Sequence, residues 1–348
     1  MINVDVAVLG AGQAGLSAAY YLRRFGLDFV VLDSGAGPGG AWQHRWPSLR
    51  LGTAHHVHDL PGLAMPDRDE TAPASEVVSD YFAAYEREFA LPVHRPVAVA
   101  AVRDAGARLH VETSTGTWAA RAVVNATGTW GKPFWPAYPG RETFRGRQLH
   151  TADYRTREEF HGKHVVVVGG GASAVQLLDE ISQVTSTTWV TRRPPIWREG
   201  PFTPEVGREA VALVEQAVRE GRPPASVVSV TGLLLTPAMQ AARERGVLNR
   251  LPMFDRITPD GVAWDDGQQV QADVILWCTG FRPVIDHLSP LKLREPRGGI
   301  LMDGTRAVRE PRLHLVGYGP SASTIGATRA GRAAAVEIRD FLEAEQVA

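Results

Sequence analysis

Two glycine-rich turns, each directly after a run of β-branched residues, constrain the fold of this chain most. The first covers residues 10–15 and follows 4–9, and the second covers 169–174 and follows 165–168. In a strand–turn–helix unit of this kind, the first glycine allows the tight turn, the second lets backbone N–H groups approach a pyrophosphate, and a small third residue lets the helix pack on the strand. One such turn is weak evidence, because an ordinary tight turn fits equally well; two predict a pair of dinucleotide sites. The residues expected to contact a dinucleotide are Gly10, Gly12, Gln13, Ala14 and Gly15 in the first turn, and Gly169, Gly171, Ala172, Ser173 and Ala174 in the second.

The end of the second strand distinguishes the two sites. From Gly10 to Asp33 is 23 positions, and from Gly169 to Arg192 is also 23. Asp33 is placed to accept hydrogen bonds from an adenosine ribose, which favours FAD or NAD. Arg192 and Arg193, after Thr191, suit a ribose 2′-phosphate, which favours NADP; the alternative is a pair of solvated charges.

Composition narrows the class of partner. The chain has 348 residues, 44% of them hydrophobic, which is enough for two domains with large cores. Lys and Arg number 37 against 38 Asp and Glu, so no basic field recruits nucleic acid or anionic lipid, and a small-molecule substrate is expected. The single cysteine, Cys278, excludes a Cys-x-x-Cys redox pair. The N-terminus leads straight into the first strand and no apolar run is long enough to span a bilayer, which predicts a cytoplasmic protein without a membrane partner.

The order of elements predicts an α/β fold of two Rossmann-like dinucleotide-binding domains, the second inserted into the first. We expect a first domain, for FAD or NAD, at 1–158 and 283–348, and an NADP domain at 159–282; the family resemblance below assigns FAD to the first domain. A long irregular loop at 35–71 is typical of a ligand-facing segment. Further expected elements are helices at 16–25, 74–89, 204–220, 237–245 and 323–343, and strands at 97–102, 108–112, 117–123, 122–125, 256–264, 272–278 and 314–317.

A segment between the two turns carries a family resemblance. Residues 144–154, from Phe144 through Gly146 and His150 to Tyr154, match the F-x-G-x-x-x-H-x-x-x-Y fingerprint of flavin-containing monooxygenases and their Baeyer–Villiger relatives. Residues 39–42, 126–128 and 277–283 resemble further blocks of the same class B enzymes, in the same order. The chain most resembles the short bacterial flavin monooxygenases.

The resemblance implies an FAD-containing monooxygenase in which NADPH reduces the flavin, O₂ adds to it, and a flavin C4a-hydroperoxide oxygenates a thioether, an amine or a ketone. The cofactor carries the chemistry, so no catalytic side chain is certain; Trp42, His150 and Phe281 are the candidates. His150 either couples NADP binding to a hinge or caps the linker structurally. Arg282 contacts either an NADP phosphate or a neighbouring carboxylate. The remaining expected contacts are Gly40, Ala41, Trp42, Ala126, Thr127, Gly128, Gly317, Gly319 and Thr324 for FAD, and Thr191, Cys278, Thr279, Gly280 and Arg282 for NADP.

Two departures from the family pattern leave the substrate open. Gly52 stands where eukaryotic members have an asparagine, and neither Arg45 nor Arg50 has the local context of the Baeyer–Villiger catalytic arginine. Two functions remain as alternatives: a flavin reductase or oxidase that releases hydrogen peroxide, and a non-catalytic NADP-binding redox sensor. The sequence also leaves open whether the chain forms a homodimer. We expect no metal at the histidines of the irregular loop, which lack a plausible fourth ligand and are expected to line the loop that covers the flavin. These are His55, His56 and His58.

Overall fold

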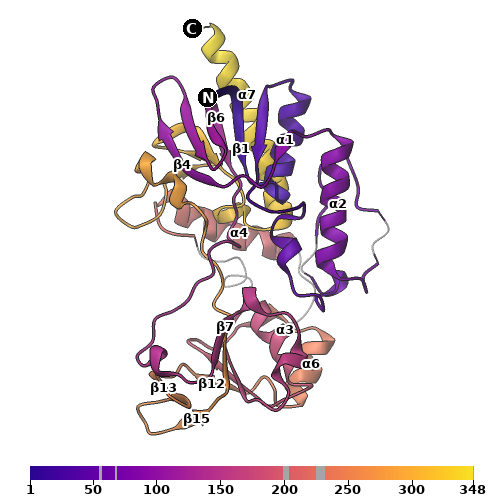
Figure 1. Ribbon diagram of the computed structural model, residues 1–348, viewed down its shortest axis with the longest axis vertical. Coiled ribbons are helices and arrows are strands. Elements are labelled where there is room, and N and C mark those ends of the chain that lie inside the picture. The colour runs from indigo at the N-terminus through magenta and orange to yellow at the C-terminus, as the bar shows by residue number, and fades with distance from the viewer. Residues whose placement is uncertain (55–56, 67–68, 199–203, 225–231, 348) are drawn as a thin grey trace. The chain divides into compact units, whose positions relative to one another are not determined.

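The computed structural model describes residues 1–54, 57–66, 69–198, 204–224 and 232–347, without the side chains of 204–210, 346 and 347. The chain forms two compact units (Figure 1). Unit 1 comprises residues 1–131, 208–227 and 283–348, and unit 2 comprises 132–207 and 228–282. The insertion of one α/β unit into another is therefore confirmed.

The first boundary of the inserted unit differs from the expected one. It falls between residues 131 and 132 rather than between 158 and 159, because β7 (Arg147–His150) pairs in parallel with β16 (Val274–Trp277) in the sheet of unit 2. The residues of α4 (Pro204–Arg219) from Arg208 onward group with unit 1. Val218 of α4 is buried in the hydrophobic core of unit 1, which explains why this helix groups with unit 1 although the residues before it belong to unit 2.

Unit 1 is built on a mixed sheet that has nine strands among the described residues, in the order β17-β18-β19-β6-β1-β2-β3, with β4 and β5 paired beside β6. β1 lies between β2 and β6, and the register pairs Leu9 with both Leu32 and Asn125, so these three parallel strands end at one edge. The expected strands at 117–123 and 122–125 are one continuous strand, β6. The strands are β1 (Ile2–Leu9), β2 (Phe29–Leu32), β3 (Val93–His94), β4 (Val99–Asp104), β5 (Leu109–Thr113), β6 (Gly116–Asn125), β17 (Met302–Asp303), β18 (Arg306–Ala307) and β19 (Glu310–Leu315).

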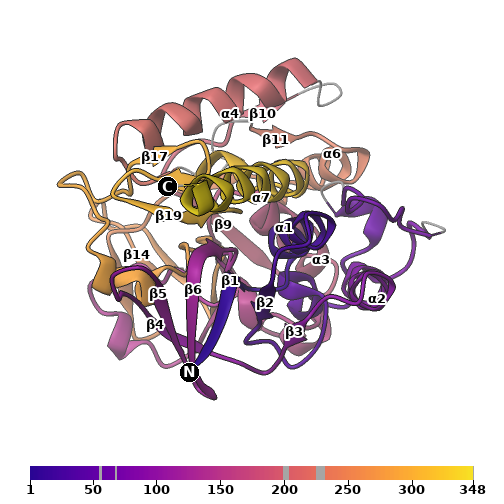
Figure 2. The same ribbon diagram turned by 90° about the horizontal axis from the view of Figure 1, so that it is seen from above.

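Three helices accompany α4 in unit 1: α1 (Gln13–Arg24), α2 (Ala74–Glu88) and α7 (Thr324–Val347). Figure 2 shows α7 alongside α1. The two helices approach closely at Gly331, where a Cβ would lie 2.8 Å from the Ala14 carbonyl oxygen. β19 pairs in parallel with β6, so the C-terminal strand and helix complete this unit as expected.

Unit 2 contains a five-stranded parallel sheet in the described residues, in the order β12-β9-β8-β16-β7. β8 is a run of four valines, all buried, as is typical of a parallel strand covered on both faces. β7 and β12 were not expected from the sequence. The remaining elements are β8 (Val165–Val168), α3 (Ala172–Ile181), β9 (Thr187–Thr191), β10 (Trp197–Arg198), β11 (Leu233–Leu234), α6 (Pro237–Glu244), β12 (Arg250–Pro252), β13 (Arg256–Thr258), β14 (Gly261–Ala263) and β15 (Gln269–Gln271).

Within the described part of the chain, no helix is both long and apolar enough to cross a membrane.

Candidate functional site

The first glycine turn connects β1 to α1 in unit 1. Gly10 has φ +98°, and a Cβ there would lie 2.6 Å from the Ala126 carbonyl oxygen. A Cβ on Gly15 would lie 1.9 Å from the Gly10 carbonyl oxygen. A Cβ on Gly12, by contrast, would meet no protein atom within 4 Å. Packing thus requires the first and third glycines, whereas the open space at Gly12 fits a pyrophosphate that approaches the backbone.

The beginning of α1 is prepared for an anionic ligand. Gly12 is its N-cap, no side chain caps it, and its first turn carries no acidic residue, so the positive end of the helix is not compensated by the chain. The buried Gln13 amide donates to the His58 carbonyl oxygen at 2.9 Å and to Thr328 Oγ1 at 3.0 Å. Gln13 Oε1 is buried without a hydrogen-bond partner, and a hydroxyl or N–H of a bound cofactor would satisfy it.

Asp33, directly after β2, is only 6% exposed. Its Oδ2 accepts from the Ala11 N–H at 2.9 Å and its Oδ1 from the Gly35 N–H at 2.6 Å. Arg95 Nη2 lies 3.6 Å from Oδ2, and two hydrogen bonds of 2.7 Å hold the same guanidinium on Glu86. A carboxylate has about four acceptor positions, so this fixed group retains capacity for ribose hydroxyls.

Two glycine segments distant in sequence lie against the start of α1. Gly40 has φ +52°, and its Cβ would lie 2.9 Å from the Cα of Gly12. Gly317, which follows β19, has φ +69°, and its Cβ would lie 3.7 Å from the Ala14 Cβ. Gly39 has no room for a side chain, because a Cβ there would lie 2.3 Å from Ser79 Oγ. Both segments carry further expected FAD residues: Ala41 and Trp42 in the 3₁₀ turn Gly40–His44, Gly319 in the turn Gly319–Ser321, and Thr324 at the start of α7.

The turn Ala126-Thr127-Gly128 continues β6 and is braced by buried polar groups. The Ala126 N–H donates to the Leu9 carbonyl oxygen at 2.8 Å, and Thr127 Oγ1 donates to the Val284 carbonyl oxygen at 2.5 Å. His287 Nε2 lies 2.6 Å from Asn125 Oδ1 and donates to it. Burial lowers the pKa of His287 to about 4, so the imidazole is neutral at pH 7. Gly128 has φ +62°, and a Cβ there would meet no protein atom within 4 Å, so this turn has open space beside it.

The second glycine turn repeats this construction in unit 2. Gly169 has φ +141°, and its Cβ would lie 2.2 Å from the Cys278 carbonyl oxygen; a Cβ on Gly171 would meet nothing within 4 Å. The Cys278 N–H donates to the Val168 carbonyl oxygen at 2.8 Å, as Ala126 does to Leu9. Gly171 caps α3 without a side-chain bond or an acid in the first turn, and Ala172, Ser173 and Ala174 begin that helix.

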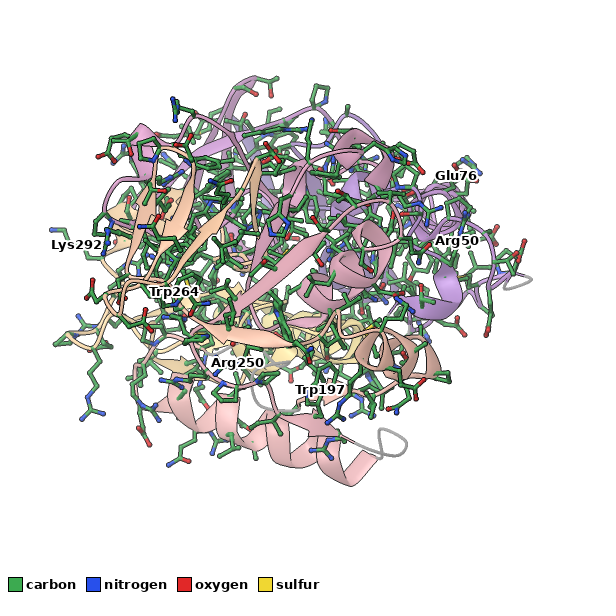
Figure 3. All side chains as sticks on the ribbon, turned by 90° about the horizontal axis from the view of Figure 1, so that it is seen from below. Arg50, Glu76, Trp197, Arg250, Trp264 and Lys292 are labelled. Carbon is green, nitrogen blue, oxygen red and sulfur yellow. The ribbon has the colours of Figure 1, made fainter. Side chains whose placement is uncertain are left out.

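In unit 2, β9, the strand that follows the glycine turn and α3, ends in exposed arginines. Thr191 is buried and its Oγ1 donates to the Arg193 carbonyl oxygen at 2.7 Å, while Arg192 and Arg193 are exposed. Arg250 on β12, labelled in Figure 3, donates from Nη1 to the Thr191 carbonyl oxygen at 3.1 Å. None of these arginines pairs with a carboxylate of the described residues. Three guanidinium groups that suit a phosphate therefore belong to residues at or beside this end of β9. Arg192 and Arg193 were predicted from the sequence, and Arg250 was not.

The segment 278–282 lies beside the second glycine turn. Burial raises the pKa of the Cys278 thiol to about 12, so this cysteine stays protonated and unreactive at pH 7. Thr279 Oγ1 donates to the Phe134 carbonyl oxygen, and Gly280, with φ +76°, has open space at its Cβ position. The exposed Arg282 guanidinium lies 4.1 Å from the centre of the Phe134 ring. Arg282 thus contacts the Phe134 ring, and it pairs with no carboxylate of the described residues.

His150 ends β7, inside unit 2 rather than ahead of it. Its Nδ1 accepts from the Ala152 N–H at 3.1 Å, so the proton lies on Nε2, which is 3.1 Å from the Gly280 carbonyl oxygen. Burial lowers the pKa of His150. The Phe281 ring lies edge-on to it at 5.0 Å. These contacts favour the structural interpretation: a neutral histidine that holds the turn at Gly280.

The other fingerprint positions are also part of the core of unit 2. A Cβ on Gly146 would lie 2.3 Å from the Asp273 carbonyl oxygen. Tyr154 is 1% exposed, and its hydroxyl donates to Glu180 on α3 at 2.8 Å. Phe144 belongs to the hydrophobic cluster of this unit. The fingerprint thus fastens β7 and the following segment to the unit.

The histidines of the irregular loop were not expected to bind a metal. Among the described residues, no group of three or more His, Cys, Asp or Glu side chains is arranged to hold an ion. His55 and His56 lie outside the described residues. The backbone carbonyl of His58 accepts a hydrogen bond from Gln13.

Two arginines near the sites, Arg95 and Arg250, were missed from the sequence, and Arg45 was considered only as a Baeyer–Villiger arginine. The Arg45 guanidinium lies over the rings of Trp42 and Trp130. Each is placed by tertiary contacts, so no local motif marks it.

Comparisons with known proteins agree with this architecture. Residues 7–217 match the family described as pyridine nucleotide-disulphide oxidoreductase. A flavin-containing monooxygenase from Stenotrophomonas maltophilia is 41% identical, with a TM-score of 0.86, over 98% of this chain and 100% of that one. An uncharacterized CzcO-like oxidoreductase from Geobacillus kaustophilus is 26% identical over 80% of each chain. A Baeyer-Villiger monooxygenase from Streptomyces coelicolor is 32% identical over 64% of this chain and 43% of its own length.

Proposed function

The chain belongs to the pyridine nucleotide-disulphide oxidoreductase family and to the flavin-containing monooxygenases, and from this we propose that it oxygenates a small soft nucleophile, a thioether or an amine, or else a ketone. FAD and NADPH are its cofactors. We place FAD at the first glycine turn and NADPH at the second. Bound FAD, once reduced by NADPH, supplies the activation of O₂.

The observation that carries this assignment is that the same turn geometry occurs in both units, while the residues at the end of the next strand carry opposite charges. In unit 1 the strand after the turn ends at a buried carboxylate, Asp33, which suits ribose hydroxyls. In unit 2 it ends at exposed Arg192 and Arg193, which suit a 2′-phosphate. The open positions at Gly12 and Gly171 give both pyrophosphates backbone contact.

The chain's own residues have binding and positioning tasks. Gln13, the start of α1 and Asp33 orient the flavin nucleotide, and the start of α3 with the arginine cluster orients NADPH. We expect the turn at Gly128 to lie beside the flavin ring and the turn at Gly280 beside the nicotinamide ring, because each is open and follows a strand end next to the glycine turn of its own unit. A dithiol mechanism has no place here, because Cys278 is the single cysteine and its thiol is buried.

The relevant test measures how NADPH oxidation is coupled to oxygenation. The purified holoenzyme is incubated with NADPH, O₂ and an aryl methyl sulfide, a tertiary amine or a cyclic ketone, and product, NADPH and hydrogen peroxide are quantified together. We expect one substrate class to give oxygenated product in near-equal amount to the NADPH consumed. Stoichiometric peroxide with every substrate would instead identify an oxidase, and a colourless protein that binds NADP without turnover would identify a sensor.

A further inference from the structure

The Arg45 guanidinium lies over two indole rings in unit 1. Its Cζ lies 4.8 Å from the centre of the Trp130 ring and 5.7 Å from that of Trp42. Trp42 belongs to the 3₁₀ turn Gly40–His44, whereas Trp130 comes shortly after β6. We call Trp42, Arg45 and Trp130 the arginine clamp.

The cation of the arginine clamp lacks a counter-charge. Arg45 Nε is buried and has no hydrogen-bond partner. No carboxylate among the described residues lies within ion-pair distance of the guanidinium. Burial lowers the pKa of Arg45 to about 10, which still leaves it charged at pH 7. The two indole rings attract the guanidinium but supply no negative charge, so Arg45 retains the capacity to bind an anion.

Arg95 shows what a structurally satisfied arginine in the same unit looks like. It is also largely buried, yet Glu86 accepts two hydrogen bonds of 2.7 Å from it and Asp33 lies 3.6 Å away. Arg50, five positions after Arg45, shows the opposite case: its side chain is exposed at the periphery of Figure 3 and solvated. Arg45 lies between these two cases: it is half-buried, and its buried Nε has no hydrogen-bond partner.

The position of the arginine clamp relates it to the proposed flavin site. Its 3₁₀ turn begins at Gly40, which packs against Gly12 of the first glycine turn. Indole faces contact flat apolar groups, and a guanidinium binds a carboxylate through two parallel hydrogen bonds. A planar organic acid offers both surfaces in one molecule, whereas a hydrated inorganic anion offers nothing to the two rings.

We propose that Arg45 receives the carboxylate of an aromatic acid between Trp42 and Trp130, so that the preferred substrates are carboxylate-bearing aromatic thioethers or amines. This inference rests on the proposed monooxygenase function and specifies its substrate class. The carboxylate supplies the missing counter-charge, and the indole rings exclude water around the pair.

Equilibrium binding to the holoenzyme tests the clamp without requiring turnover. The ligands are 4-(methylthio)benzoate and its uncharged amide, titrated by tryptophan fluorescence with wild type, Arg45→Met and the matched control Arg50→Met. We expect Arg45→Met to weaken benzoate binding by about 30-fold or more while amide binding is unchanged. Arg50→Met should behave as wild type with both ligands. Arg45→Lys should retain part of the preference, because it keeps the charge but loses the fork.

Three outcomes would overturn the proposal. Wild type could bind acid and amide equally; Arg45→Met could weaken both equally; or it could lose bound FAD, seen in its visible absorbance, and keep acid preference in the FAD-loaded fraction, which would assign Arg45 to the cofactor. Failure of oxygenation with intact, Arg45-dependent acid binding would instead refute the monooxygenase function alone.

Thermal unfolding distinguishes a residue that binds the substrate carboxylate from a residue that stabilises the fold. Replacing an uncompensated buried cation by methionine should leave the unfolding temperature unchanged or raise it, since functional sites commonly carry such unfavourable groups. A lowered unfolding temperature together with unchanged acid preference would make Arg45 a structural residue.

Discussion

The two glycine turns share their backbone design and differ in what surrounds the end of the next strand. In unit 1, Asp33 is buried and fixed by two backbone N–H groups and by Arg95. In unit 2, Arg192 and Arg193 are exposed and unpaired with described carboxylates. An enclosed, fixed acceptor suits a cofactor that stays bound, and exposed cations suit a cosubstrate that must leave after each turnover.

The likeness extends to the strand on the far side of each turn. Ala126 and Cys278 donate to the strand that precedes the glycine turn of their unit and present a carbonyl oxygen to Gly10 or Gly169. Each is followed by a threonine and an open glycine of positive φ, at Gly128 and Gly280. We therefore propose that the shared frame fixes where a dinucleotide lies, whereas the strand ends select which one.

The largest expected effect separates packing glycines from ligand glycines within one turn. Gly15→Ala should destabilise unit 1 by about 3 kcal/mol or more, because its Cβ would lie 1.9 Å from the Gly10 carbonyl oxygen. Gly12→Ala should fold normally and lose FAD, because its Cβ enters space that protein atoms leave empty. Circular dichroism melting and flavin absorbance measure the two effects.

The matched variant in unit 2 is Gly171→Ala, which should keep FAD and raise KM for NADPH. A Gly12→Ala protein that retains FAD at wild-type occupancy would contradict the assignment of the first turn.

Acid sensitivity is the next expected difference, and it concerns unit 1. Burial lowers the pKa of His287 and of His314 to about 4. The unfolded chain takes up these protons near pH 6.5 and the folded chain does not, so stability is full above pH 6.5 and falls as the pH drops toward 4. Each histidine should cost on the order of 3 kcal/mol at pH 4.

Urea unfolding between pH 7.5 and 4.5 checks this, with His314→Gln as the variant that removes one titration. We expect a shallower loss of stability with decreasing pH in the variant, whatever its stability at pH 7. Glu337 Oε2 lies 3.7 Å from His314 Nδ1 and its own pKa is raised by burial. An unchanged pH slope in His314→Gln would mean that protonated His314 is accommodated beside Glu337.

How far the sequence predicts the sites depends on whether the signal is local. The glycine turns, the strands before them and Asp33 lie within one continuous stretch, so spacing alone located them. Arg95 lies 62 positions after Asp33 and reaches it only through the parallel pairing of β2 and β3. β7 looked like a linker because a four-residue strand shows no period, and its place is set by β16. Arg45 stood in the correct loop, but its isolation from carboxylates is a property of packing.

The smallest expected effect tests whether the exposed arginines of unit 2 select the cosubstrate. Arg192→Ala combined with Arg193→Ala should raise KM for NADPH by about 30-fold, equivalent to about 2 kcal/mol for lost charge-assisted hydrogen bonds. KM for NADH should change little, because NADH lacks the 2′-phosphate that these groups are proposed to hold. Arg243→Ala, an exposed arginine on α6 of the same unit, controls for the loss of surface charge. Equal increases for both nucleotides would remove the 2′-phosphate role, and the contrast between the two strand ends would then lie in Asp33 alone.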